Sequence, residues 1–385
     1  MKLTIERKAL AEAVGVAKGF LNPRSPLPIV QTIKLVATAQ TLTLEATNLE
    51  TSGTVIIPAD VSELGAVCIP GALLAEMVGR FPAGELTIET LGEGRCSLSC
   101  KGSRYELSIL PAEEWPETRL SDVTSSATMP QAVLAGLIAQ ATVAAAKTQQ
   151  EARAVMTGVL VTLDLDRLTM TSTDGRRLAH VEEVVSLSGD SGNLSAVIPA
   201  EALRQLSRVL GKTGEVTLTT TGRDARFTLP GYEFRAQLLE GCFPDASKVI
   251  PSASEADKTA RLGVSDLVRA IKRLLPLAQE KRSPGLLRLS FAAGGLHITA
   301  NTPDVGSGEE RVECQFEGEP LTIGFNGNYL LDGLSVLDQD GDVEIEMRTD
   351  TKSAVLHAPA DRGFLYVAMP VKLRDVAEDY ERQAA

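Results

Sequence analysis

The stretch IPAEALRQLSRVLGKTGEVTLT, residues 198–219, decides the fold because the chain contains related versions of it three times. IPGALLAEMVGRFPAGELTIE starts at Ile69 and FNGNYLLDGLSVLDQDGDVEIE starts at Phe325, so the starts lie 129 and 127 residues apart. Each version has a helix-entry signal, about three turns of apolar periodicity, a turn at Gly or Asp, and an alternating strand. A period near one third of the chain indicates three copies of one domain.

Two further markers repeat with the same period. LTLEATNLE, LTMTSTDGR and LHITANTPD start at Leu42, Leu168 and Leu296. YELSILPAEEWP and YEFRAQLLEGCFPD start 127 residues apart, at Tyr105 and Tyr232. Three markers with one period support the threefold repeat.

Each copy also opens with a second helical segment: ERKALAEAVGVAKGF, PQAVLAGLIAQATVAAAK and SDLVRAIKRLLPLAQEK. Two helices and many short alternating strands in each copy predict an α+β fold. Polar joints rich in Ser, Thr and Pro lie at residues 116–130 and 251–260. We therefore predict three tandem domains at residues 1–120, 128–250 and 258–385, the last with a short C-terminal extension.

Composition narrows the class of protein. The chain has 385 residues, of which 44% are hydrophobic and only 4% aromatic, so we expect aliphatic cores. No run of 18 apolar residues predicts a membrane span, and the start MKLTIERKAL lacks the apolar segment of a signal peptide. These features favour a cytoplasmic protein.

The residue types that carry chemistry are sparse. Five scattered cysteines are typical of reduced thiols, and no second Cys/His pair completes a zinc site. The chain lacks phosphate-binding, dinucleotide-binding and HExxH motifs. GDSG at residues 189–192 leaves open a hydrolase that uses Ser191, but the chain has only three histidines to serve as a base. We predict no enzyme activity, no metal and no cofactor.

The distribution of charge is more informative than its sum. The net charge of −12 argues against nucleic-acid binding at first sight. However, Arg204 and Arg208 share one helix face, whereas strands and loops carry much of the acid, as in VEEVV and DQDGDVEIE. The basic residues are either a solvated face or, with three copies, a common positive surface.

At this point four motifs reveal a family. Within the threefold repeat, the chain carries the motifs TSTDGRRLA, FPDASKVIP, FNGNYLLD and YVAMPVKL. With these motifs it resembles the β subunit of bacterial DNA polymerase III, the sliding clamp, over residues 1 to about 373. The resemblance implies a head-to-tail homodimer that forms a ring, with helices around a central hole and sheets outside. It implies that duplex DNA passes through the hole independently of sequence. It also implies that the polymerase catalytic subunit, the clamp loader and other proteins with clamp-binding motifs are tethered by peptides, which gives processivity.

The resemblance also implies three sets of residues. The peptide-binding groove would contain Met156, Thr173, Gly175, Arg176, Arg177, Leu178, Pro244, Lys248, Val249, Asn326, Tyr329, Val367, Ala368, Met369, Pro370, Val371 and Leu373. Resemblance and helical faces together predict that Arg24, Arg80, Gln150, Arg153, Arg204 and Arg208 face DNA. The dimer interface would contain Tyr105, Leu107, Leu274 and Leu277. Within the groove, we expect Leu178 and a C-terminal strand through residues 369–371 to form one apolar pocket, with Arg177 at its rim.

The chain departs from the family pattern at a few positions. Arg176 stands where the family often has His, and Ala154 and Val155 stand where some members have two tyrosines near DNA. A charged tail, residues 374–385, runs past the last motif and could cover the groove, extend it or remain disordered. The alternative function is a protein-docking adaptor without DNA in its hole.

Overall fold

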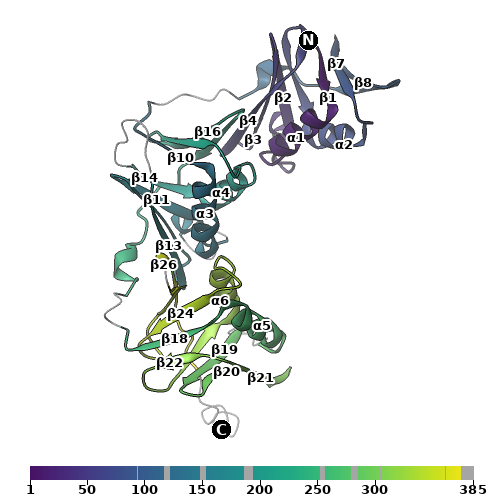
Figure 1. Ribbon diagram of the computed structural model, residues 1–385. Coiled ribbons are helices and arrows are strands. Elements are labelled where there is room, and N and C mark those ends of the chain that lie inside the picture. Colours follow the sequence, from purple (N-terminus) through teal and green to yellow (C-terminus); the bar gives the residue numbers. More distant parts are fainter. Residues whose placement is uncertain are drawn as a thin grey trace. The chain divides into compact units, whose positions relative to one another are not determined.

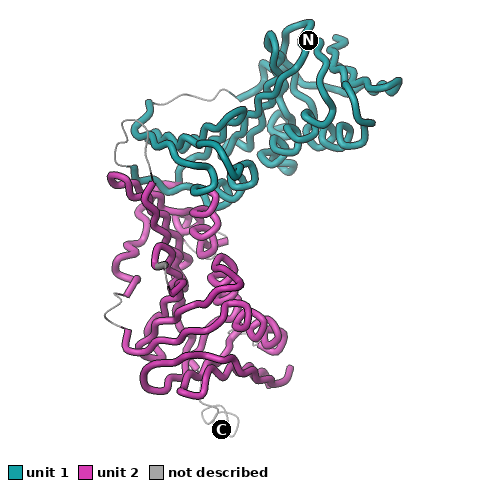
Figure 2. Tube along the Cα trace, viewed as in Figure 1, with its two compact units in different colours: residues 1–134, 186–238 teal, residues 135–185, 239–385 magenta. Residues whose placement is uncertain are grey.

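The computed structural model describes residues 1–92, 94–116, 122–147, 153–185, 194–251, 256–278, 285–303, 305–359 and 361–373 (Figure 1). The chain divides into two compact units, residues 1–134 with 186–238 and residues 135–185 with 239–385 (Figure 2). The central repeat thus contributes to both units, which the sequence did not indicate. Residue boundaries of the three domains stay a prediction.

The first unit contains two antiparallel sheets. One has the order β5 (Asp60–Glu63), β1 (Lys2–Glu6), β7 (Glu85–Gly92), β8 (Arg95–Cys100) and β9 (Ser103–Ser108). The other has the order β10 (Ser125–Pro130), β15 (Glu215–Thr220), β16 (Asp224–Leu229), β17 (Tyr232–Gln237), β4 (Thr51–Pro58), β3 (Thr41–Thr47), β2 (Thr32–Thr38) and β6 (Gly65–Pro70). β14 (Leu194–Pro199) leads directly into a helix.

The second unit also contains antiparallel sheets. Within it, strands pair in the order β11 (Gly158–Asp164), β12 (Arg167–Thr173), β13 (Arg177–Val184), β26 (Asp361–Ala368), β25 (Ala354–Ala358), β24 (Asp342–Met347), β18 (Lys258–Gly263) and β22 (Gln315–Glu317). A smaller sheet has the order β21 (Gly306–Val312), β20 (Gly295–Thr302), β19 (Leu286–Ala292) and β23 (Leu321–Asn326).

The helices confirm the threefold repeat. α1 (Arg7–Lys18), α3 (Gln131–Ala141) and α5 (Val264–Leu274) each follow a strand without a loop, namely β1, β10 and β18. α2 (Gly71–Arg80), α4 (Ala200–Ser207) and α6 (Gly327–Leu334) follow β6, β14 and β23 in the same way. Short 3₁₀ helices occupy Pro28–Gln31, Ala112–Glu114, Thr142–Ala144, Ala154–Thr157, Ala246–Lys248 and Leu275–Leu277. No helix in the described ranges is both long and apolar enough to cross a membrane.

Consecutive copies join edge to edge through paired strands. β17 of the second copy pairs with β4 of the first, and β26 of the third pairs with β13 of the second (Figure 1). At the first seam Phe234 lies opposite Gly53, and a Cβ at Gly53 would lie 2.2 Å from the ring of Phe20. The Phe20 and Phe234 rings lie 5.2 Å apart, so glycine lets an aromatic pair pack across the seam.

Away from the seams the core is mainly aliphatic, as the composition predicts. α1 buries Leu10, Ala13, Val14 and Ala17. Cys68 and Cys96 are also buried, and burial raises the pKa of each thiol to about 11. These thiols therefore stay protonated near neutral pH and act as small apolar side chains.

Candidate functional site

The TSTDGRR segment forms a tight turn between β12 and β13. Gly175 has φ +85°, the left-handed conformation that glycine adopts at little cost. The Thr173 hydroxyl donates to the Arg177 carbonyl at 2.7 Å and accepts from the Gly175 N–H at 3.0 Å. Asp174 accepts from the N–H groups of Arg176 and Arg177, at 2.9 and 3.0 Å. The turn is therefore fixed by its own side chains.

Arg177 is the buried centre of this region. Its side chain donates to Asp174 at 3.0 Å and to Asp332 of α6 at 2.5 Å, and its guanidinium lies 4.5 Å from the centre of the Tyr329 ring. Burial would lower the pKa of Arg177, but the Tyr366 hydroxyl, Asp332 and Asp174 outweigh burial and raise it. The residue is only 4% exposed, so its predicted place at the rim is wrong: it joins the turn to α6 from inside.

The apolar floor is a cluster on the same sheet. Leu178, Val355 and Val367 are buried together, with Ala246, Ile250 and Leu365 packed against them. Leu178 and Val367 are paired positions on β13 and β26. The sequence predicted these two but missed Val355, Ala246 and Ile250, because single apolar residues in strands and loops carry no separate signal.

The C-terminal segment runs from the turn to another strand. β26 ends at Ala368, so the predicted strand through residues 369–371 is wrong. Instead the Met369 N–H donates to the Arg176 carbonyl at 2.9 Å, and the Val371 N–H donates to Gly324 at 2.8 Å. A Cβ at Gly324 would lie 2.8 Å from a Leu373 methyl group, so glycine there allows this close packing.

The remaining predicted groove residues differ in exposure and in their partners. Met369 and Val249 are exposed large apolar side chains, whereas Pro370 and Tyr329 are half-buried. The Cε of Met156 lies 3.5 Å from the position of a Cβ on Gly175. The Asn326 side chain caps α6. Lys248 forms an ion pair with Asp245 at 3.4 Å, and Pro244, the residue before Asp245, is half-buried. The arrangement offers an apolar floor with polar groups around it, which suits apolar side chains of a peptide.

The predicted DNA-facing residues are exposed or half-buried but are not all free. Arg80 pairs with Glu76 at 2.7 Å and Arg204 with Glu201 at 3.5 Å, in each case on its own helix. Arg24, Arg153 and Arg208 are exposed. Gln150 lies outside the described residues, as do Ser191 and the tail from residue 374. Nearby carboxylates thus reduce the positive charge that the sequence suggested for the helices.

The predicted interface residues lie on an edge strand and on a helix that packs against another edge strand: Tyr105 and Leu107 are on β9, whereas Leu274 on α5 and Leu277 in the following 3₁₀ helix pack against Gly308 of β21. β9 is an edge of the five-stranded sheet and β21 is an edge of the four-stranded sheet. Tyr105 on β9 is exposed and packs edge-on against Phe81. Leu107 and Leu274 are 7% and 3% exposed within the chain, and Leu277 is half-buried. Of the four, Tyr105 and Leu277 therefore offer the most accessible surface.

Among the described residues, one group has the spacing of metal ligands: Glu344, Glu346 and buried His357. Arg362 binds the carboxylate of Glu346 and lies 3.2 Å from His357 Nε2. His357 Nδ1 lies 2.9 Å from the Ala358 carbonyl. A guanidinium thus already neutralises this cluster, which serves as an ion-pair network within the fold.

Comparison with known proteins agrees with the threefold repeat. Profiles of the DNA polymerase III beta subunit match residues 1–119 (N-terminal domain), 128–245 (central domain) and 247–372 (C-terminal domain). The chain is 33% identical to the beta sliding clamp of Streptomyces coelicolor and 30% identical to that of Vibrio cholerae, with 97% of this chain and 100% of each relative covered.

Solved structures give the same result. The DNA polymerase sliding clamp of Bacillus subtilis matches with a TM-score of 0.90 at 25% identity. A sliding clamp of Pseudomonas aeruginosa bound to griselimycin matches with a TM-score of 0.90 at 28% identity. Each match covers 97% of this chain and 100% of the other. The fold, the threefold repeat and these relatives together show that the chain belongs to the DNA polymerase III β-subunit family, the DNA sliding clamps.

Proposed function

We propose that this sliding clamp closes into a ring as a head-to-tail homodimer, encircles duplex DNA in the cytoplasm and tethers partner proteins by peptides bound at the groove around Leu178. The expected partners are the catalytic subunit of DNA polymerase III, the clamp loader and other proteins with clamp-binding motifs. Family membership supports the prediction of a non-catalytic processivity factor and disfavours both alternatives, the adaptor without DNA and the hydrolase using Ser191.

The observation that carries the groove is its apolar floor with exposed anchors beside it. Leu178, Val355 and Val367 form a buried apolar layer against which partly buried Ile250 and Leu365 pack, and Met369, 42% exposed, is free to adapt to a bound side chain. The Arg177 network fixes the turn against α6, so the floor exists before a peptide binds. Preorganisation of this kind lowers the entropy lost on binding.

The seams supply a physical argument for the ring. In each seam, the last strand of one copy (β17 or β26) pairs with a strand of the preceding copy (β4 or β13). The corresponding last strand of the first copy is β9, and the corresponding partner in the third copy is β21. Both are edge strands within the chain. Pairing β9 of one molecule with β21 of a second would use both edges, and repeating it would close a dimer.

The same comparison suggests which residues meet. TSG at residues 51–53 corresponds to GSG at residues 306–308. A Cβ at Gly308 would lie 2.6 Å from a Leu277 methyl and 3.2 Å from one of Leu274, as Gly53 lies under Phe20. Because Phe234 faces Gly53, Leu107 should face Gly308 of the partner and contact Leu277. Tyr105 would lie two residues further along.

DNA binding would be loose and independent of sequence. Arg24, Arg153 and Arg208 would contact phosphates, and the paired Arg80 and Arg204 would contribute less because Glu76 and Glu201 offset their charge. Such contacts carry no sequence information, so DNA can slide while the closed ring retains it.

The test is retention on nicked circular DNA after loading, measured before and after the circle is linearised. A clamp is retained on the circle and lost from linear ends. In parallel, calorimetry with a clamp-binding peptide should show that Met369→Ala weakens binding by about 1–3 kcal/mol, as expected for one anchor contact. Equal retention on linear and circular DNA would reject encirclement, and equal peptide affinity with an intact dimer would move the groove elsewhere.

A further inference from the structure

We infer that the seam between β4 and β17 holds a second protein-binding site, a polar pocket that captures an acidic peptide segment of a partner protein. The inference rests on the proposed function in one respect: the pocket lies on the sheet face away from the helices, and therefore away from the DNA.

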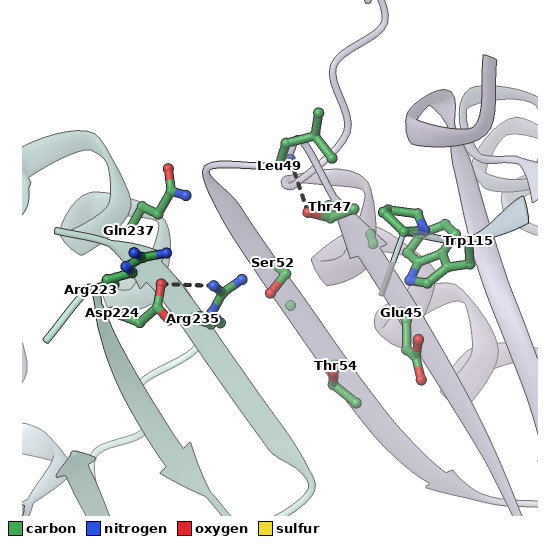
Figure 3. A pocket seen from close by; sticks show the side chains of 13 residues that line it. Glu45, Thr47, Leu49, Ser52, Thr54, Trp115, Arg223, Asp224, Arg235 and Gln237 are labelled. Carbon is green, nitrogen blue, oxygen red and sulfur yellow. Dashed lines mark hydrogen bonds and ion pairs between the residues drawn. The ribbon is translucent and has the colours of Figure 1, made fainter. Parts of the chain in front are cut away.

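The pocket lies at the position equivalent to the groove. It has a volume of about 310 Å³ and lies within the first unit (Figure 3). It is lined by Glu45, Ala46, Thr47, Leu49, Ser52, Gly53, Thr54, Trp115, Pro116, Arg223, Asp224, Arg235 and Gln237. Trp115-Pro116 corresponds to Phe243-Pro244, which precedes the segment over the groove floor.

The two turns beside the seams are built alike. The Thr47 hydroxyl donates to the Thr51 carbonyl at 2.9 Å and accepts from the Leu49 N–H at 3.0 Å. Asn48 accepts from the N–H groups of Glu50 and Thr51. These bonds match those of Thr173 and Asp174 one for one. The turn beside the pocket therefore repeats the hydrogen bonds of the turn beside the groove.

The side chains on the outer face differ. Leu178 pairs with Val367 and Val367 with Val355 across three neighbouring strands. In the first unit the equivalent pairs join Ser52 to Arg235 and Arg235 to Arg226. The outer face is thus apolar at the seam between β13 and β26 and cationic at the seam between β4 and β17.

This positive charge is only partly neutralised. Asp224, buried, pairs with Arg235 at 2.8 Å, and Glu45 pairs with Lys34 at 3.1 Å. Within the described residues, neither Arg223 nor Arg226 has an ion-pair partner at hydrogen-bonding distance. Arg235 lines the pocket, and its Nε is a buried donor without a hydrogen-bond acceptor among the described residues. Arg223 lines the pocket and is exposed, so its guanidinium is available to a carboxylate ligand.

An apolar contact accompanies the charge. Leu49 has φ +78° and is 46% exposed, whereas the equivalent Gly175 adopts φ +85° without a side chain. This conformation costs a leucine free energy, and the exposed side chain is available for contact with a ligand. Leu49 and Trp115 both line the pocket (Figure 3). They offer an apolar contact to a peptide residue that lies between two acidic residues.

The mode of binding follows from the strands. β4 is paired on both sides, with β3 and β17, so a peptide cannot add to it as a further strand. The peptide must lie across the sheet face and be held by side chains. A segment with carboxylates on either side of an apolar residue fits Arg223, Arg235 and Leu49. Because the helices cover the other face, threaded DNA does not compete for the pocket.

Trp115 is the only tryptophan in the chain and reports on the site directly. The probe is a blocked pentapeptide of alternating Glu and Leu, titrated against Trp115 fluorescence at physiological salt, beside its counterpart with Gln for Glu. We expect saturable binding of the acidic peptide only. Arg223→Glu should weaken it at least about tenfold because a charge is reversed in the pocket wall. Lys212→Glu is the matched control, because it makes the same charge change at an exposed residue that neither lines the pocket nor belongs to the predicted DNA contacts.

No saturable binding by the wild type would overturn the inference, and so would equal affinity for the Gln peptide or an unchanged affinity in Arg223→Glu. If inorganic phosphate alters Trp115 fluorescence as strongly as the peptide, the pocket is a small-anion site and the peptide assignment fails. DNA retention and groove binding are measured on the same variants. If the wild type shows neither DNA retention nor groove binding, the clamp function is refuted. If it is retained on DNA but does not bind the acidic peptide, only this inference is refuted.

Discussion

Replacing Arg177 by methionine should loosen the second unit without emptying its core. Methionine keeps a long unbranched side chain but removes the guanidinium that binds Asp174 and Asp332 and lies over Tyr329. Asp174 would then stay mostly buried without a cationic partner, and the Tyr366 hydroxyl, which is 3.4 Å from Arg177, would lose that contact. We expect α6 and the turn to separate more easily.

The magnitude follows from burial. Breaking a buried ion pair by removing one partner costs about 3–5 kcal/mol. Asp332 is 45% exposed and can be hydrated once released, so the lower end, about 3 kcal/mol, applies. For a unit of this size each kcal/mol corresponds to roughly 2–4 °C in melting temperature, which gives a decrease of roughly 6–12 °C.

Calorimetry measures this decrease, and Trp115 provides an internal control because it lies in the other unit. Arg167→Met is the matched variant: Arg167 pairs with Glu182 on the same sheet, but its side chain is exposed, so we expect less than about 1 kcal/mol. If Arg177→Met shifts the melting temperature no more than Arg167→Met does, Arg177 does not hold the turn to α6. If only the unfolding transition reported by Trp115 fluorescence shifts, the substitution acts on the first unit and the proposed role of Arg177 in the second unit is refuted.

Three other predictions follow from single residues. Burial lowers the pKa of His180 below its usual 6.5, so protonation favours the unfolded state. The free energy of unfolding should therefore fall as pH drops below about 6.5, and urea titrations should show a smaller fall for His180→Gln. Tyr105→Asp should give monomers in sedimentation and lower the melting temperature less than Leu107→Asp does, because Tyr105 is exposed whereas Leu107 is buried within its own unit; a dimeric Tyr105→Asp would count against the β9–β21 interface. Leu49→Gly should not destabilise the chain and could stabilise it by up to about 1 kcal/mol, since glycine relieves the left-handed strain; a clear loss in denaturant melts would show that Leu49 is held there by packing.

The sequence predicted those parts of the fold that repeat. Ile69, Ile198 and Phe325 mark equivalent strand-to-helix junctions because each stretch carries its own periodicity and entry signal. The motif around Gly175 located the turn, since Thr173 and Asp174 form its hydrogen bonds locally. Local chemistry of this kind can be read from the residues themselves.

The burial of Arg177 could not be read in this way. Its partner Asp332 is 155 positions away along the chain, and no local pattern joins the two. An arginine beside another arginine in a turn ordinarily favours solvent, and Arg176 does remain exposed. The division of the central copy between two units had the same origin, because the pairing of β13 with β26 is a long-range contact.

The seams explain where three copies of one domain can diverge. Residues that face the helices are constrained: Phe234 must pass over Gly53, and Tyr366 lies 2.5 Å from where a Cβ on Gly333 would stand. Alternate positions on the same strands point away from the helices, so their side chains do not enter that core. Val367 at one seam, covered by Ala246, Ile250 and Leu365, and Arg235 at the other occupy equivalent positions on this outer face. A repeated clamp domain can therefore change what each seam binds without changing how its copies join.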